Sequence, residues 1–131
     1  MKWAAKYLGI PYVRGGCGAD GADCWGLVRL VLREERGLDM PALAIGQTGN
    51  ARALRRCFAG WQAADLRRLG EFDIVTMRNA HGHHVGIVAD TDGVGVMLLH
   101  CDDPQSHVMR LSLMQQFGYR DFRAWRYCGN G

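Results

Sequence analysis

Thiols and imidazoles together can perform nucleophilic catalysis, and the chain of 131 residues holds five cysteines and five histidines. Cys24 differs from the other cysteines because it follows Asp23, a typical helix N-cap, and begins an amphipathic pattern. The N-terminus of a helix favours a nucleophilic thiolate. A second interpretation stays open, in which Cys24 is a small core residue. The neighbouring Asp23 carboxylate also works against a nucleophilic role, because it raises the pKa of the thiol.

A nucleophilic thiol needs a general base and a third group that orients the base. His84 opens a predicted strand, and His100 lies near the end of the strand that follows it. The glycine-containing loop before His84 is expected to leave two further histidines in solvent. The full set of candidate bases is His81, His83, His84, His100 and His107.

The register of these two strands decides whether His84 and His100 share a face of the sheet. A two-residue turn at Asp92-Gly93 places them on opposite faces and sets Cys101 beside His84. A three-residue loop, or a bulge at Gly93 or Gly95, restores the pair. A Cys–His–His triad therefore requires an odd loop or a bulge.

A metal site is the competing use of the same region. The spacing contains no HExxH motif and no CxxC pair, so we predict no metal and no cofactor. The side chains that have suitable ligand atoms are those of His81, His83, His84, His100, Cys101, Asp102 and Asp103.

Composition and length indicate one globular domain spanning residues 1–131. Hydrophobic residues make up 48% and charged residues 22%, as in ordinary folded domains. The net charge is +3 and the arginines are dispersed, so nucleic-acid binding is not expected. The odd cysteine number without a CxxC pair argues against a disulfide framework.

The sequence also gives expectations about location. No apolar run approaches the ~20 residues of a membrane helix, and residues 1–10 lack the apolar stretch of a signal peptide. We therefore expect no membrane span, synthesis in the cytoplasm and no export by the usual route.

The pattern of elements predicts an α+β fold, with N-terminal helices packed on a mostly antiparallel sheet of about five strands. Glycines crowd residues 9–23, where close approach of the backbone is expected. Helices are predicted over residues 1–8, 24–36, 50–58 and 63–69, the last two weakly. Strands are predicted over residues 72–77, 84–89, 94–101, 107–111 and 122–127.

Four segments resemble the NlpC family of bacterial cell-wall cysteine peptidases. They read GIPYVRGG at 9–16, DCWGLV at 23–28, HVGI at 84–87 and LH at 99–100. The stretch from the cysteine helix to residues 36–41 is typical of the branch found in bacteriophage tails, prophages and gene-transfer agents. The resemblance covers nearly the whole chain.

This resemblance implies a papain-like fold with three catalytic residues. Cys24 would be the nucleophile, His84 the general base and His100 the residue that orients His84. Tyr12 matches a tyrosine that lies beside the thiol and helps to bind substrate or to stabilise the oxyanion.

The resemblance further implies a peptidoglycan stem peptide as substrate, cut between D-γ-glutamyl and diaminopimelate, without a cofactor. Phage tail proteins would be partners, and a virion would deliver the enzyme to the cell wall. Two alternatives remain: a structural tail-tip component with little hydrolytic activity, and a related amidase, thioesterase or acyltransferase.

Two residues beside the nucleophile affect substrate preference. Trp25 stands where many cell-wall members have serine, so it either lines the cleft or packs on the sheet. Asp23 either binds a substrate amine, caps the helix or does both.

Overall fold

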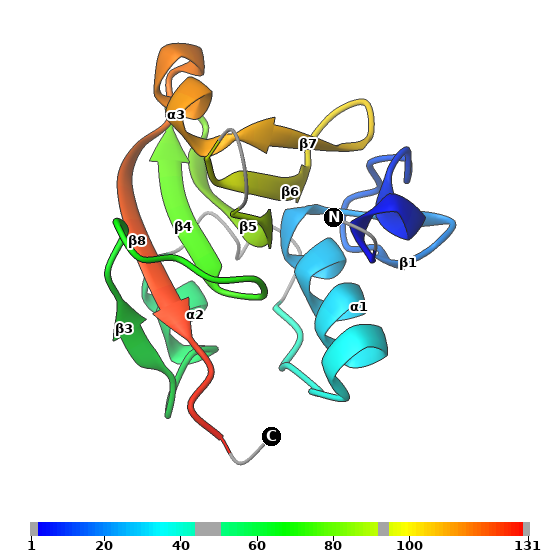
Figure 1. Cartoon of the computed structure of the whole chain (residues 1–131). Coiled ribbons are helices and arrows are strands. Elements are labelled where there is room, and N and C mark those ends of the chain that lie inside the picture. Colours follow the sequence, from blue (N-terminus) through cyan, green and yellow to red (C-terminus); the bar gives the residue numbers. More distant parts are fainter. Residues whose placement is uncertain (1–2, 44–50, 92–94, 130–131) are drawn as a thin grey trace.

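A computed structural model describes residues 3–43, 51–91 and 95–129 (Figure 1). Met1, Lys2, Asn50 and Val94, which belong to predicted elements, lie outside the described residues, as does the possible turn at Asp92-Gly93. The helices are η1 (Ala4–Tyr7), α1 (Cys24–Arg36), α2 (Ala51–Arg56), α3 (Leu111–Met114) and η3 (Gln115–Phe117).

The main sheet has six antiparallel strands in the order β3-β8-β4-β5-β6-β7, which confirms the predicted α+β class. The last strand of the chain, β8, lies between β3 and β4 rather than beside β7. The strand bounds are β3 (Gln62–Ala64), β4 (Ile74–Asn79), β5 (Gly82–Asp90), β6 (Met97–Cys101), β7 (Ser106–Arg110) and β8 (Arg120–Arg126).

The helix predicted over residues 63–69 was wrong. Gln62–Ala64 is a strand whose residues pair with Ala124, Trp125 and Arg126 of β8. The backbone of β8 provides hydrogen-bond partners from far along the chain, and these override a weak local helical pattern.

Helix α1 agrees with its predicted bounds because both ends have strong local signals. The Asp23 carboxylate caps the helix by accepting a hydrogen bond from Gly26 N–H, at 2.7 Å. Gly37 ends it in the left-handed conformation, with φ 65°. The cap fixes Cys24 as the first helical residue.

The glycine-rich loop before α1 folds back on itself through two short strands, β1 (Cys17–Gly18) and β2 (Gly21–Ala22). A Cβ at Gly26 would lie 1.7 Å from the carbonyl oxygen of Gly16, so only glycine lets the loop and helix meet. The predicted close backbone approach is therefore confirmed.

Both faces of the main sheet are covered. Helix α1 packs on one face, where its Leu27, Val28 and Val31 join Ile74 and Ile87 in the larger core. Met114 of α3, which was not predicted as a helix, covers Val75 and Leu98 on the opposite face. Within the described parts of the chain, no helix is long and apolar enough to span a membrane.

A β-bulge between β5 and β6 sets the register near the site. Asp90 pairs with Met97, but Ile87 pairs with Leu99, so Ala89 is the extra residue. The register at Asp90 alone would place His84 and His100 on opposite faces, and the bulge places them on the same face. The predicted bulge exists, but it is at Ala89 and not at Gly95, and Gly93 lies outside the described residues.

Candidate active site

A pocket of about 740 Å³ lies where the start of α1 meets the ends of β5 and β6. It brings together the predicted nucleophile and base, Cys24 and His84, with the two predicted substrate-binding residues Tyr12 and Asp23. Its other lining residues are Arg14, Asn79, His81, His83, Cys101, Asp102, Asp103 and Tyr119.

Cys24 is held at the base of this pocket, with 8% of its surface exposed. Burial raises the pKa of its thiol, and the nearby backbone N–H groups of Val85 and Trp25 oppose this rise. Val85 directly follows His84 in β5, so the thiol lies beside the segment that carries the imidazole. The helix cap at Asp23 and the strand β5 position this sulfur together.

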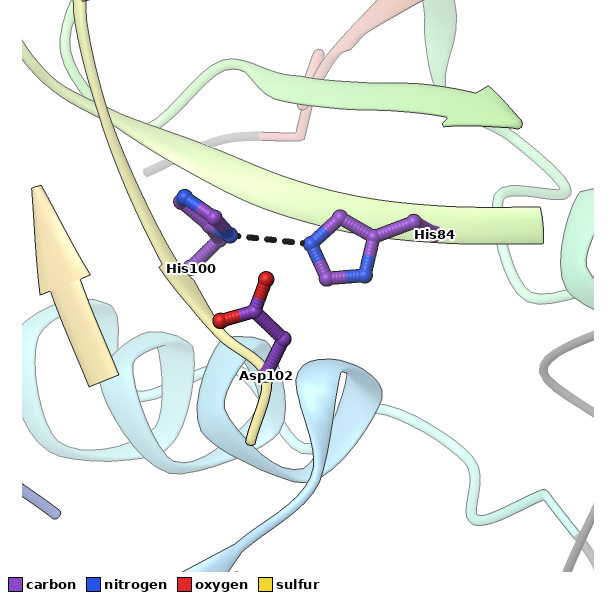
Figure 2. A group of neighbouring side chains, drawn as sticks. All are labelled: His84, His100 and Asp102. Carbon is purple, nitrogen blue, oxygen red and sulfur yellow. Dashed lines mark hydrogen bonds between the residues drawn. The ribbon is translucent and has the colours of Figure 1, made fainter. Parts of the chain in front are cut away.

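His84 and His100 point toward each other from the neighbouring strands β5 and β6 (Figure 2). His84 Nε2 lies 3.0 Å from His100 Nδ1, and the rings are perpendicular, at 88°. This hydrogen bond leaves Nδ1 of His84, on the other side of the ring, to receive a proton from a thiol. The arrangement is that of a base and a group that orients it.

The tautomers follow from this geometry. If His84 Nδ1 is to accept a proton, its Nε2–H must donate to His100 Nδ1, and His100 then carries its hydrogen on Nε2. His100 is fully buried, and within the described residues its Nε2 has no hydrogen-bond partner.

Tyr119 and Asp102 lie beside the two histidines. Asp102 was considered from the sequence only as a possible metal ligand, and Tyr119 was not identified. The Tyr119 ring packs on His84, with centroids 5.2 Å apart, and its hydroxyl donates to Asp102 at 3.1 Å. The His107 ring lies 4.2 Å from that of His100. Tyr119 follows an isolated glycine at the start of β8, and nothing in its local sequence connects it with β5.

Burial controls the charge states of the site. It raises the pKa of the Cys24 thiol to about 12, with a further contribution from the Asp23 carboxylate. It lowers the pKa of His84 to about 3 and that of His100 to about 4. The resting pair is therefore a neutral thiol and a neutral imidazole, and the helix N-terminus does not ionise Cys24 by itself.

The unfolding free energy is expected to fall as the pH is lowered from about 7 to 5. Both buried histidines stay neutral in the folded chain but bind protons below the ordinary pKa of 6.5 when unfolded. Each can contribute up to about 1.4 kcal/mol per pH unit. Urea unfolding at pH 7.5, 6 and 5 measures the slope.

The variant His100→Asn removes one of these two groups and is expected to reduce the slope by about half. The Glu35 carboxyl does not contribute to the slope between pH 5 and 7.5, because the hydrogen bond from Lys6 lowers its pKa and it stays ionised there. Equal unfolding free energies at pH 7.5 and pH 5 would contradict the neutral, buried state of the pair.

Of the possible metal ligands, the structure gathers His84, His100 and Asp102, whose ligand atoms lie within 4.8 Å of one another. The two imidazole nitrogens that face each other are joined by a hydrogen bond at 3.0 Å. A metal would have to replace this bond, which also orients the base. We therefore interpret His84 and His100 as a hydrogen-bonded pair, beside which Asp102 accepts a hydrogen bond from Tyr119.

Asp23 has a mainly structural position. One carboxylate oxygen accepts from Gly26 N–H, and the other accepts from Gly15 N–H at 2.9 Å. It thus joins the glycine-rich loop to the helix cap while its side chain borders the pocket.

Tyr12 stands at the rim of the pocket, with 39% of its surface exposed. Burial of its phenol, the nearby Cys24 thiol and the Asp23 carboxylate raise its pKa. Its hydroxyl is therefore a protonated hydrogen-bond donor beside the thiol.

Trp25 does not line the pocket. Its side chain is buried, its indole N–H donates to the carbonyl oxygen of Pro41 at 2.9 Å, and its ring packs edge-on against Phe58. The structure therefore supports packing for Trp25 and does not support a place in the lining of the cleft. Successive residues of a helix point in directions about 100° apart, so Trp25 points away from Cys24 and packs on Phe58.

Comparison with known proteins gives a consistent result. The model of the NlpC/P60 family matches residues 9–125. The solved structure of the NlpC/p60 domain of the peptidoglycan hydrolase SagA is similar, with 25% sequence identity and a TM-score of 0.61. The similarity covers 92% of this chain and 90% of that chain. No curated protein matches the sequence significantly.

Proposed function

The chain belongs to the NlpC/P60 family, and from this premise we propose that it is a cysteine peptidase that hydrolyses the peptides of peptidoglycan. The observation that carries the proposal is the pocket in which a thiol at a helix N-terminus meets a hydrogen-bonded pair of histidines. Cys24 is the nucleophile, His84 the general base and His100 the residue that orients His84.

Acylation begins from the neutral pair. As the Cys24 sulfur attacks the amide carbonyl carbon, its proton moves to His84 Nδ1, and His84 becomes an imidazolium. The carbon–sulfur bond forms, and the carbonyl oxygen becomes an oxyanion. Collapse of this intermediate breaks the carbon–nitrogen bond, and His84 gives the proton to the leaving amine. A thioester on Cys24 remains.

Deacylation reverses the roles. His84, again neutral, takes a proton from a water molecule, which attacks the thioester carbon. Breakage of the carbon–sulfur bond releases a carboxylic acid, and the proton returns to the thiol. His100 accepts the Nε2–H hydrogen bond of His84 throughout and stabilises the imidazolium.

Two donors can stabilise the oxyanion. The backbone N–H of Cys24 lies at the helix N-terminus, where the first N–H groups have no partner within the helix. The Tyr12 hydroxyl borders the same pocket and stays protonated. We propose these two groups as the oxyanion site.

The bond that we propose is the amide between D-γ-glutamyl and diaminopimelate, as the family resemblance implies. Digestion of purified muropeptides followed by mass spectrometry tests both the activity and the bond. Products of the masses expected for cleavage at this amide support the proposal. An intact muropeptide mixture contradicts it.

From the sequence of residues 24–41 we also propose that the chain associates with a bacteriophage tail. Mass spectrometry of purified phage or gene-transfer particles from a producing strain tests it. Copurification of the chain with tail proteins supports the association, and recovery of the chain only outside the particles contradicts it.

Substitution of His100 is expected to show what this residue contributes. His100→Asn keeps an acceptor for the His84 Nε2–H, so kcat should fall by no more than about tenfold. His100→Leu leaves that N–H buried without a partner, so kcat should fall by about 10²- to 10³-fold. Equal losses in the two variants, with both folded, would indicate that His100 only fills space.

A further inference from the structure

A second pocket, of about 710 Å³, adjoins the candidate active site. His83 lines both pockets and therefore marks the boundary between them. The other lining residues of this second pocket are Leu54, Arg55, Thr76, Met77, Arg78, Asp121, Phe122 and Arg123.

Strand register places the polar side of this pocket on the face of the sheet that α1 covers. His83 pairs with Arg78, and Thr76 pairs with Arg123. These residues alternate in phase with Ile74 of β4, which packs in the core formed with α1. The second pocket therefore lies on the same side of the sheet as the helix that begins at Cys24.

Positive charge dominates the rim of the second pocket. It has three arginines, and Asp121 is the one carboxylate among its lining residues. Asp121 forms an ion pair with Arg78. The guanidinium groups of Arg55 and Arg123 have no ion-pair partner within the described residues, and both residues are exposed.

One side of the pocket is apolar. Leu54 of α2 packs in the same core as α1, and only 2% of its surface is exposed. Two free guanidinium groups beside a buried apolar wall can bind a carboxylate or phosphate through charge-assisted, bidentate hydrogen bonds. A lysine would supply only a point charge at the same place.

We propose that this second pocket is a subsite for an acidic group of the substrate, held by Arg55 and Arg123. The inference rests on the proposed function, since the substrate that occupies the first pocket must extend past His83. The chemistry required is an oxyanion: a carboxylate of the peptide, or a phosphate of a polymer attached to the cell wall. The subsite then makes a charged substrate preferable to its neutral, amidated form.

Steady-state kinetics on two muropeptides test the proposal, one with free carboxylates and one with the same carboxylates amidated. Arg55→Gln/Arg123→Gln is expected to raise KM for the free carboxylate by about 10- to 100-fold, with kcat nearly unchanged. The double variant and the wild type should treat the amidated substrate alike. Arg33→Gln, an exposed arginine at the far end of α1, is the matched control.

The possible outcomes distinguish a carboxylate from a phosphate ligand, and a failure of the subsite from a failure of the proposed function. A phosphate ligand is identified if inorganic phosphate inhibits the wild type competitively, the double variant loses this inhibition, and amidation of the substrate has no effect on KM. Equal KM values for wild type and double variant on both substrates, without such inhibition, overturn the subsite. An effect of Arg33→Gln as large as that of the double variant would do the same, since it indicates general charge attraction.

If the wild type cleaves neither muropeptide, the proposed function fails, and the subsite is then tested by binding. Calorimetry with the γ-D-glutamyl-diaminopimelate dipeptide and with inorganic phosphate measures this directly. Binding that the double variant loses supports the subsite. Absence of binding by the wild type overturns it.

Discussion

Replacement of Cys24 by alanine is expected to lower kcat for muropeptide cleavage by at least about 10⁴-fold. Alanine keeps the first turn of α1 and its Asp23 cap but removes the atom that forms the thioester. The pocket would still bind the peptide, so KM should change little. Mass spectrometry of a timed muropeptide digest measures the loss.

The chain offers a matched control in Cys101, which lines the same pocket and is also buried. Its sulfur donates to the carbonyl oxygen of Ala22 at 3.2 Å, so it holds the loop before α1. Cys101→Ser keeps this donor and should retain most activity. Unchanged cleavage by Cys24→Ala, or an equal loss in Cys101→Ser, would exclude Cys24 as the sole nucleophile.

Replacement of His84 by glutamine is expected to lower kcat by about 10³- to 10⁴-fold. The burial that raises the pKa of the Cys24 thiol to about 12 leaves it almost wholly protonated at neutral pH. Without a base at position 84, the proton cannot leave as the sulfur attacks. Loss of activity should therefore appear in kcat more than in KM.

Activity of the His84 variant should recover partly as the pH rises, because hydroxide then ionises the thiol directly. His81→Gln is the matched control, since His81 borders the same pocket but lies in the exposed turn between β4 and β5. It should keep nearly full activity at pH 7. A His84 variant as active as this control would remove His84 from the mechanism.

Local signals explain why α1 could be predicted to the residue. The Asp23 cap, the left-handed Gly37 and the apolar spacing of Leu27, Val28 and Val31 all lie within the helix or beside it. Each stabilises the same boundaries, so no distant contact was needed to locate Cys24.

Elements that depend on distant partners could not be predicted in this way. Gln62–Ala64 is a strand only because the edge of β8, some sixty residues later, pairs with it. The place of β8 between β3 and β4 also has no signature in its own residues. Short helix α3 forms where Met114 can cover the second face of the sheet.

The site also combines residues that local sequence could identify with an arrangement that depends on distant contacts. Residue types and order pointed to Cys24, His84 and His100, but their facing depended on a register that a single bulge changes. That bulge is at Ala89, a residue without the glycine signal that was expected. Tyr119 contacts His84 from the residue just before β8, and only the tertiary structure connects the two.

The most direct test of Cys24 as the nucleophile uses a muropeptide analogue in which a chloromethyl ketone replaces the scissile amide. The thiol displaces chloride, and the thioether that forms survives digestion. After incubation at pH 7, digestion and peptide mass spectrometry locate the adduct. We expect one equivalent of adduct, on Cys24, and we expect this adduct to form much more slowly in His84→Gln. An adduct on another cysteine, or none while native muropeptides are still cleaved, would contradict the role of Cys24 as the nucleophile.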